Sequence, residues 1–236
     1  MIRFAWFYNS RPDFKPSDGE AQSEAEMIKL YTWGTPNGRK ISIMLEEVCL
    51  PYQVVPIDIS KGEQFDPAFL AINPNNKIPA IVDEDTGQSF FESGAILLYL
   101  AEKSGQLLPD NANDKWQVMQ WLMWQMAGQG PMLGQAHHFL HFNPGKSEYA
   151  EERYLQEAER LYRVLDKQLE RSRFVATGEL TIADIAVWPW VSRYQFHKID
   201  LSAFQNVLEW YLRLAKRPAF HAGYQVPDAE QQVPMP

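Results

Sequence analysis

The chain has 236 residues, of which 45% are hydrophobic and 22% charged, and its formal net charge at pH 7 is -8. This composition suits a soluble globular protein with one large core or two modest ones. The negative charge disfavours nucleic acid and anionic membranes as partners, because both are negatively charged themselves. Cys49 is the only cysteine, so we expect neither an intrachain disulfide nor a cysteine-based zinc site, and we expect a reducing, cytoplasmic location.

Residues 1–26 contain a short apolar run followed by charges, prolines and glycine. This pattern lacks the apolar segment of a secretory signal, and no later segment reaches the length that spans a bilayer. A strand pattern begins after Met27. We therefore predict that residues 1–26 form an N-terminal extension or tail outside the fold.

A strand, helix, strand pattern opens the rest of the chain. Residues 28–33 and 52–59 are typical of strands, and between them apolar residues recur with helical spacing at Ile41, Met44, Leu45 and Val48. Such a unit pairs its strands in parallel. A helical turn at 65–74, strands at 78–85 and 88–93, and a helix at 92–103 follow. We predict an α/β thioredoxin-like domain with a mixed sheet over residues 27–105.

Strand patterning then stops and long helical periodicity replaces it. Residues 116–126 and 151–172 are predicted to be long helices. Thr181 and Asp184 have the spacing of a capping box, which opens a further apolar helix. We predict an all-helical domain over residues 114–236.

Several motifs in these two regions are similar to those of a known family. They are "TPNGRKI", "NPNNKIPAIVD", "FFESGAILLYLAEK", "GPMLGQAHHF" and "LTIADIAVWPW". With them, nearly everything after Met27 resembles the soluble glutathione transferases, and most closely the bacterial nu-class, whose members are glutathione-dependent disulfide-bond reductases. The resemblance implies an enzyme that uses glutathione as co-substrate and no metal. It also implies weaker peroxidase and conjugating activity and a homodimer.

The resemblance assigns the backbone and the γ-glutamyl end of glutathione to two places. The Ile78–Pro79 bond is expected to be cis, so that the backbone of Ile78 pairs with the cysteinyl unit of glutathione. Glu92 and Ser93 stand at a helix start, where they can serve simply as a cap. The same position also suits the γ-glutamyl carboxylate, with Glu92 receiving the ammonium group.

Three further residues enter as glutathione contacts only through the resemblance. Gln64 and Lys77 would otherwise be interpreted as solvated surface residues. Arg153 either pairs with Glu157 one turn later or reaches a glutathione carboxylate, within the subunit or across a dimer interface.

Thr35 and Asn37 occupy the turn where thioredoxin-like proteins keep a reactive dithiol, and this chain has no cysteine there. We therefore expect glutathione to supply the reactive sulfur. The Thr35 hydroxyl and the Asn37 backbone NH would stabilise the thiolate, with Pro36 fixing the first helical turn and Gly38 allowing close approach of the backbone and the ligand.

Other chemical groups give weaker hypotheses. Cys49 ends a helix among apolar neighbours, which favours an unreactive, core-like thiol. His137 and His141 stand four apart and could share a helical face for a metal, but no third ligand has suitable spacing, so we expect them to line a substrate cleft. The Trp- and Met-rich residues 116–124 are expected to lie in the core and the dimer interface. The alternative function is a non-catalytic module that binds glutathione or apolar ligands.

Overall fold

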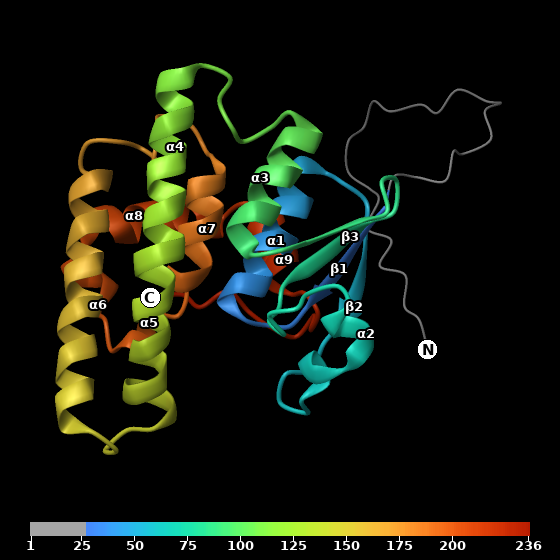
Figure 1. Ribbon diagram of the computed structural model, residues 1–236. Helices are drawn as coiled ribbons and strands as arrows, with labels where there is room; N and C mark the ends of the chain where they lie inside the picture. The colour runs from blue at the N-terminus through green and yellow to red at the C-terminus, as the bar shows by residue number, and fades with distance from the viewer. Residues whose placement is uncertain (1–26) are drawn as a thin grey trace.

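The computed structural model describes residues 27–236 of the chain (Figure 1). The expected tail, residues 1–26, lies outside the described part. None of the helices within residues 27–236 is both long enough and apolar enough to cross a bilayer.

The first half of the described chain is built on a 4-stranded mixed sheet in the order β2-β1-β3-β4. β1 and β2 are parallel, whereas β3 is antiparallel to β1 and β4 is antiparallel to β3. The elements of this sheet half are β1 (Ile28–Thr32), α1 (Pro36–Val48), β2 (Tyr52–Pro56), η1 (Glu63–Phe65), α2 (Pro67–Leu70), β3 (Ala80–Asp83), β4 (Gln88–Phe91) and α3 (Ser93–Ser104). The predicted thioredoxin-like fold is confirmed.

Alternation along β1 places the helices on both faces of the sheet. Leu30 packs into the main core with α1 and α3, whereas Tyr31 packs with Phe69 of α2 in a smaller cluster on the other face. All four strands are shorter than predicted, and prolines bound two of them. β2 ends at Pro56 and β3 begins after Pro79, and a proline has no NH to donate to a strand ladder.

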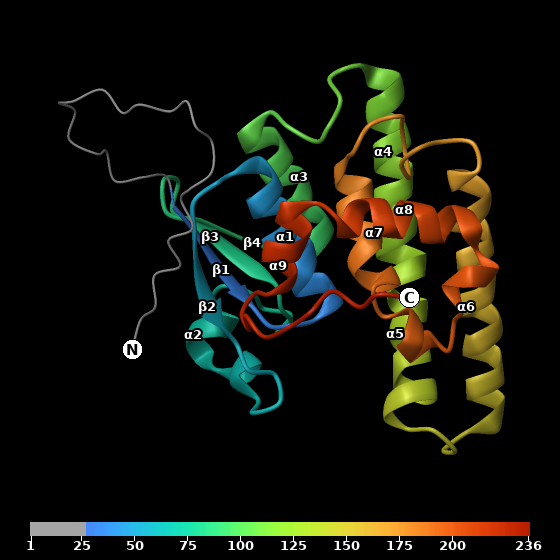
Figure 2. The ribbon, with the colours of Figure 1, turned by 180° about the vertical axis from the view of Figure 1, so that it is seen from behind.

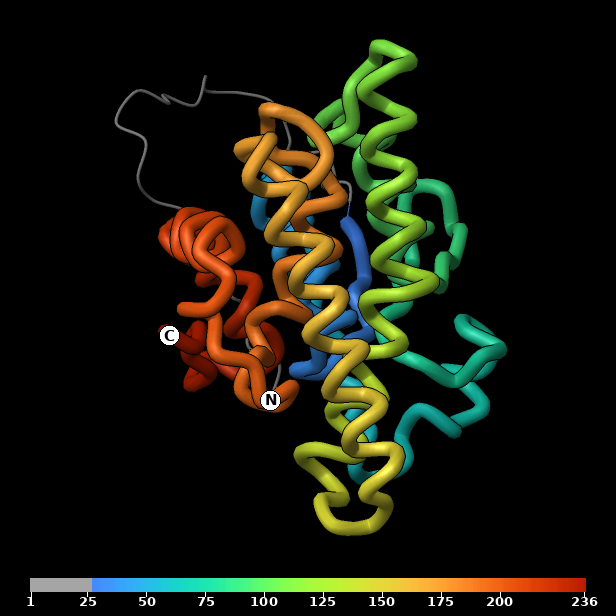
Figure 3. Tube along the Cα trace, turned by 90° about the vertical axis from the view of Figure 1, so that its left-hand side faces the viewer, coloured from blue at the N-terminus to red at the C-terminus, as the bar shows by residue number. Residues whose placement is uncertain are grey.

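The second half is entirely helical. Its elements are α4 (Ala112–Trp124), η2 (Gln125–Gln129), α5 (Gly130–Ala136), η3 (His137–Phe142), α6 (Glu148–Leu169), α7 (Ile182–Val191), η4 (Tyr194–His197), η5 (Leu201–Ala203), α8 (Gln205–Ala215) and α9 (Pro218–Tyr224). Seen from the side away from the sheet, α4 and α6 run alongside each other (Figure 3). The whole of α7 is buried, and Thr181 and Asp184 form the expected capping box at its start.

Residues 112–142 form one helical run that is much longer than the predicted helix over 116–126. Two π-helical stretches, η2 and η3, interrupt it. Gly130 and Pro131 argue against a helix in the sequence, yet both lie in the first turn of α5, where proline is tolerated. π-turns inserted into α-helices are frequent at functional sites.

The end of the chain folds back onto the sheet half, with α9 beside α1 (Figure 2). The two helices approach so closely that a Cβ on Gly223 would lie 2.5 Å from the backbone nitrogen of Ile43. Ser42 Oγ donates to the Gly223 carbonyl at 2.6 Å, and Arg39 Nε donates to the Tyr224 carbonyl at 3.2 Å. Helix α1 is therefore enclosed between the sheet, α7 and α9.

Candidate active site

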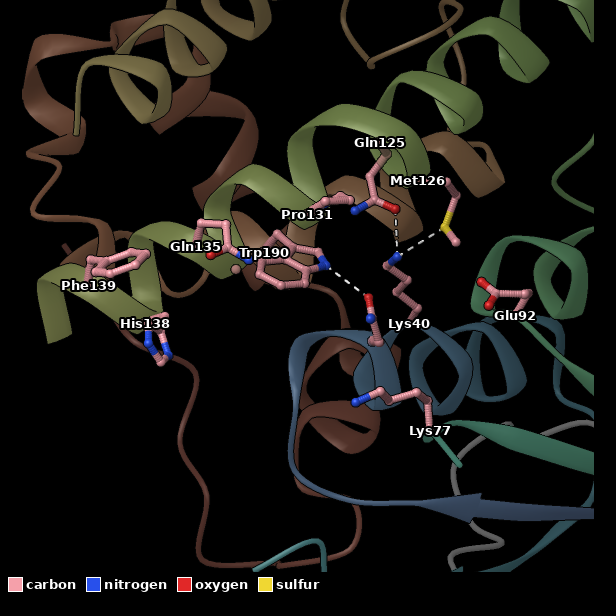
Figure 4. A pocket seen from close by; sticks show the side chains of 13 residues that line it. Lys40, Lys77, Glu92, Gln125, Met126, Pro131, Gln135, His138, Phe139 and Trp190 are labelled. Carbon is pink, nitrogen blue, oxygen red and sulfur yellow. Dashed lines mark hydrogen bonds between the residues drawn. The ribbon is translucent and has the colours of Figure 1, made fainter. Parts of the chain in front are cut away.

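A cavity of about 720 Å³ lies between the sheet half and the helical half (Figure 4). The start of α1 and the start of α3 form one side of it, and the helical run from η2 to η3 together with α7 forms the other. Its lining residues are Asn37, Lys40, Lys77, Glu92, Gln125, Met126, Gly130, Pro131, Gly134, Gln135, His138, Phe139 and Trp190.

The turn before α1 is closed by a side-chain cap. Thr35 is the N-cap, and its Oγ1 accepts a hydrogen bond from the Gly38 NH at 3.2 Å. The hydroxyl hydrogen of Thr35 stays available for a second acceptor. The first-turn NH groups of a helix, including that of Asn37, have no intrahelical acceptor. The turn therefore presents a hydroxyl and a backbone NH to an anion.

Gly38 is required here for a reason that differs from the expected one. A Cβ at this position would lie 2.3 Å from the Trp33 carbonyl oxygen and 2.4 Å from Thr32 Oγ1. Real Cβ contacts are longer than this, so a side chain would push the turn away from β1. The close approach that glycine permits is thus between α1 and the strand that precedes it.

Two side chains of the helical half hold this turn. Trp190 Nε1 donates to Asn37 Oδ1 at 3.0 Å, and Arg193 Nη2 donates to the Gly34 carbonyl at 3.1 Å. Trp190 also lines the cavity, so the same residue shapes the binding space and anchors the turn.

The loop before β3 contains the expected cis bond between Ile78 and Pro79. Ile78 is half-buried, and Lys77 is exposed and lines the cavity. Asn73 holds the loop in place, because its Nδ2 donates to the Lys77 carbonyl at 2.6 Å.

The start of α3 brings Glu92 to the cavity wall, and Ser93 follows it without lining the cavity. Glu92 is the N-cap, with φ of 66°, a backbone conformation that residues with a Cβ rarely adopt. Its carboxylate makes no capping hydrogen bond and is exposed to the cavity. Ser93 is buried, and its Oγ accepts from Lys40 Nζ at 3.1 Å.

Lys40 is a site residue that the sequence reasoning missed. It is 1% exposed and donates to Gln125 Oε1 at 2.5 Å, with Met126 Sδ at 3.5 Å (Figure 4). Burial lowers the pKa of Lys40 to about 7, and the negative charge of Glu92 acts in the opposite direction. A signal was present in the sequence: Lys40 stands four residues before Met44, on the apolar stripe of the helix.

Gln64 and Arg153 lie apart from this cavity. Gln64 belongs to η1, and its Oε1 is buried with no hydrogen-bond partner among the described residues. Arg153 is exposed on α6. The expected alternative partner of Arg153, Glu157, instead accepts two hydrogen bonds from Arg160, both at 2.7 Å.

The histidines of η3 correct another expectation. His137 does not line the cavity but is buried in a stack on His197, with ring centroids 4.6 Å apart. Burial lowers the pKa of His137 to about 3. His141 is exposed and stacks on Phe196 at 3.7 Å, whereas the cavity is lined by His138. Within residues 27–236, no group of histidine, cysteine and acidic side chains is arranged to hold a metal ion.

Cys49 is exposed, which contradicts the core-like position predicted for it. It is the C-cap of α1, with φ of 56°, so the chain turns away from the helix and carries the thiol outward. It does not line the cavity.

Comparison with known proteins identifies the family. The glutathione S-transferase N-terminal domain matches residues 26–102, and the glutathione S-transferase C-terminal domain matches residues 130–218. The disulfide-bond oxidoreductase YfcG of Escherichia coli is 52% identical over 198 residues, covering 82% of this chain and 92% of YfcG. The chain belongs to the glutathione S-transferase family.

Other members of the glutathione S-transferase family agree in sequence and in structure. The disulfide-bond oxidoreductase YghU of E. coli is 42% identical and aligns with 83% of this chain and 73% of YghU. A Pseudomonas putida glutathione transferase, crystallised with one glutathione disulfide per subunit, superposes with a TM-score of 0.80 at 42% identity. That match covers 86% of this chain and 92% of the P. putida chain. A Burkholderia graminis glutathione transferase with two bound glutathione molecules has a TM-score of 0.81 at 39% identity, covering 86% and 89% of the two chains.

Proposed function

We propose that this glutathione S-transferase is a glutathione-dependent disulfide-bond reductase. The observation that carries the proposal is the Thr35 turn beside the cavity, which offers a hydroxyl and a backbone NH to an anion but contains no thiol of its own. The two curated relatives described above are disulfide-bond oxidoreductases. Related structures hold glutathione or its disulfide.

The turn can stabilise a thiolate by enough to matter at neutral pH. A free thiol has a pKa near 8.5, and lowering it by about two units takes about 2.7 kcal/mol. A helix N-terminus contributes about 0.3 to 1 kcal/mol. A hydrogen bond to a charged acceptor adds about 1.5 to 3 kcal/mol. The Thr35 hydroxyl and the Asn37 NH together are therefore sufficient.

The reaction proceeds by thiol–disulfide exchange. The glutathione thiol loses its proton to solvent, and the thiolate attacks one sulfur of the substrate disulfide. A bond forms between glutathione and that sulfur, and the other substrate sulfur leaves as a thiolate that takes up a proton. A second glutathione thiolate then attacks the mixed disulfide and releases the second substrate thiol. Two glutathione molecules are oxidised to one glutathione disulfide, and one substrate disulfide is reduced to two thiols.

The other predicted residues hold glutathione at this turn. The Ile78 backbone pairs with the cysteinyl unit, Ser93 and the first turn of α3 receive the γ-glutamyl carboxylate, and Glu92 receives the ammonium group. Lys77, on the cavity rim, faces the glycyl end. Gln64 offers its Oε1 as a hydrogen-bond acceptor that has no partner among the described residues. Arg153 completes the site, either within the same subunit or from the second subunit of the dimer.

The protein acts as a homodimer through the outer face of α4. Trp116 is 66% exposed and Met123 is 47% exposed, and they lie two turns apart on this helix. Large apolar side chains on one exposed stripe are typical of an interface. We place the reaction in the cytoplasm, where the glutathione pool is reducing.

The test is turnover of 2-hydroxyethyl disulfide with glutathione, coupled to glutathione reductase. We expect turnover well above the rate of uncatalysed exchange. We also expect that monothiols without the γ-glutamyl group cannot replace glutathione. Rates equal to background in a folded protein would support the non-catalytic module instead.

A further inference from the structure

Lys40 is a buried cation whose hydrogen-bond partners are all uncharged. Its ammonium group donates to Ser93 Oγ and Gln125 Oε1 and lies near Met126 Sδ. The ion pairs of the described residues do not include it. The negative charge of Glu92 acts on Lys40 without a direct contact. A buried charge without a paired counter-ion is costly, and an apolar side chain could fill the same space. The position therefore points to a negative charge that arrives with a ligand.

The cavity gives an anion access to this cation. Lys40 and Glu92 both line it, and Ser93, which follows Glu92 at the start of α3, contacts Lys40 directly. Ser93 Oγ accepts from Lys40 Nζ and donates to Met126 Sδ at 3.5 Å. Because a thioether sulfur is a weak acceptor, a carboxylate can replace it as the partner of the serine hydrogen. The first-turn NH groups of α3 are available at the same end of the helix. A carboxylate at Ser93 would thus meet a hydroxyl donor backed by a cation.

We propose that Lys40 is the positioning residue that compensates the charge of the carboxylate bound at Ser93, and that ligand binding is coupled to uptake of a proton by Lys40. This inference rests on the proposed function, which supplies the ligand as the γ-glutamyl end of glutathione. Lys40 acts through Ser93: it fixes the direction of the serine hydroxyl and supplies the counter-charge.

The electrostatics of the cavity support the coupling. Burial holds the pKa of Lys40 at about 7 in the ligand-free protein. A carboxylate nearby favours the charged form and raises that pKa, so above pH 7 the amine takes a proton from the buffer. The other titratable side chains on the cavity are Glu92, Lys77 and His138. The residues that η2, α5 and α7 contribute to the cavity have no titratable side chain.

The experiment is isothermal titration calorimetry with S-methylglutathione, whose sulfur cannot ionise. Titration in two buffers of different ionisation enthalpy gives the number of protons bound with the ligand. For the wild type we expect close to one proton per ligand at pH 8 and close to none at pH 6, where Lys40 is already charged.

Matched variants assign the proton to its acceptor. Lys40→Met should bind S-methylglutathione without proton uptake and about ten- to a hundredfold more weakly, the loss expected for one charge-assisted hydrogen bond. It should raise KM for glutathione more than it lowers kcat, because the γ-glutamyl end lies away from the reacting sulfur. Lys77→Met removes an equal charge from the exposed rim, and His138→Gln removes the imidazole of the cavity. Both should keep the proton uptake.

The outcomes separate this inference from the proposed function. Binding without proton uptake at pH 8 overturns the role of Lys40 and leaves the reductase proposal intact. Uptake that persists in Lys40→Met, or disappears in His138→Gln, overturns it as well. If S-methylglutathione does not bind at all, this inference fails, and turnover of 2-hydroxyethyl disulfide with glutathione decides the reductase proposal separately. Should Lys40→Met not fold, the proton counts of the wild type and His138→Gln decide the matter.

Discussion

Trp190 of α7 donates its indole NH to Oδ1 of Asn37 in the first turn of α1, at 3.0 Å. This hydrogen bond joins the helical half to the turn that would hold the reactive sulfur. The side chain of Asn37 therefore fixes the turn against a buried helix, while its backbone NH is the one that we propose for the thiolate.

Replacing Trp190 with phenylalanine should weaken catalysis more than folding. The variant keeps an aromatic ring but loses the NH, which costs about 0.5 to 1.5 kcal/mol. We expect a drop of about three- to tenfold in kcat/KM for 2-hydroxyethyl disulfide and a small decrease in Tm. Asn37→Ala should lower kcat/KM by a similar factor. The double variant should lower it little further, because both changes remove the same hydrogen bond. Fully additive losses would contradict this coupling.

Thr35→Ala should raise the pKa of bound glutathione. The hydroxyl supplies a hydrogen bond to the thiolate worth about 1.5 to 3 kcal/mol, which corresponds to one to two pKa units. If thiolate attack limits the rate, turnover falls about ten- to a hundredfold. The pH dependence of thiolate absorbance at saturating glutathione measures the shift, and Thr35→Ser should restore it. An unchanged pKa and an unchanged rate in Thr35→Ala would show that the sulfur lies elsewhere.

Cys49 should be dispensable for disulfide reduction. The thiol is exposed at the end of α1 and outside the cavity, so we expect alkylation by iodoacetamide without loss of turnover. Mass spectrometry of the modified protein gives the extent of reaction, and Cys49→Ala is the control, with the wild-type rate and no adduct. Loss of activity that follows alkylation in the wild type alone would make this cysteine part of the mechanism.

Lys40 should make the stability of the ligand-free protein depend on pH. Burial lowers its pKa from 10.5 to about 7, so between these values the unfolded chain binds more protons than the folded one. The stability from this group is complete above pH 10.5 and is lost as the pH falls toward 7. We expect denaturant titrations at pH 7 and pH 9 to show a smaller pH dependence in Lys40→Met than in the wild type. Equal slopes would argue against a neutral buried amine.

Charge on the outer face of α4 should prevent dimer formation. Trp116→Glu and Met123→Glu each place a carboxylate among the exposed apolar side chains of this helix, where a second subunit would bury it. We expect light scattering to give a dimer for the wild type and a monomer for these variants. Met235→Glu alters an equally exposed apolar residue of the C-terminal segment and should leave the dimer intact. A wild-type monomer at micromolar concentration contradicts the proposed interface.

Local signals predicted the elements that carry the site. The alternating pattern of β1, the apolar stripe of α1 and the Thr181–Asp184 capping box depend on neighbouring residues, and all appear in the structure. The motif around Ile78 and Pro79 indicated the cis bond only through the family resemblance, because most bonds before proline are trans.

Contacts between distant segments could not be predicted in the same way. Lys40 lies on the apolar stripe of α1, but its partners Ser93 and Gln125 belong to α3 and η2, which are distant in the sequence. The sequence around His137 does not reveal that it is buried, because the ring on which it stacks, His197, belongs to a distant element, η4. Cys49 is exposed because the backbone takes a left-handed conformation after Val48, a choice that the residue type alone does not reveal.

The contact between α9 and α1 has a consequence for synthesis on the ribosome. Arg39 is 0% exposed, and its Nε bonds to the carbonyl of Tyr224, while Ser42 bonds to that of Gly223. These partners are translated long after the sheet half has left the exit tunnel. In a nascent chain, the Thr35 turn is therefore followed by an uncovered Arg39 on α1 until nearly the whole protein has been made. The site becomes complete only when translation is almost over, so incomplete chains do not present a finished active site.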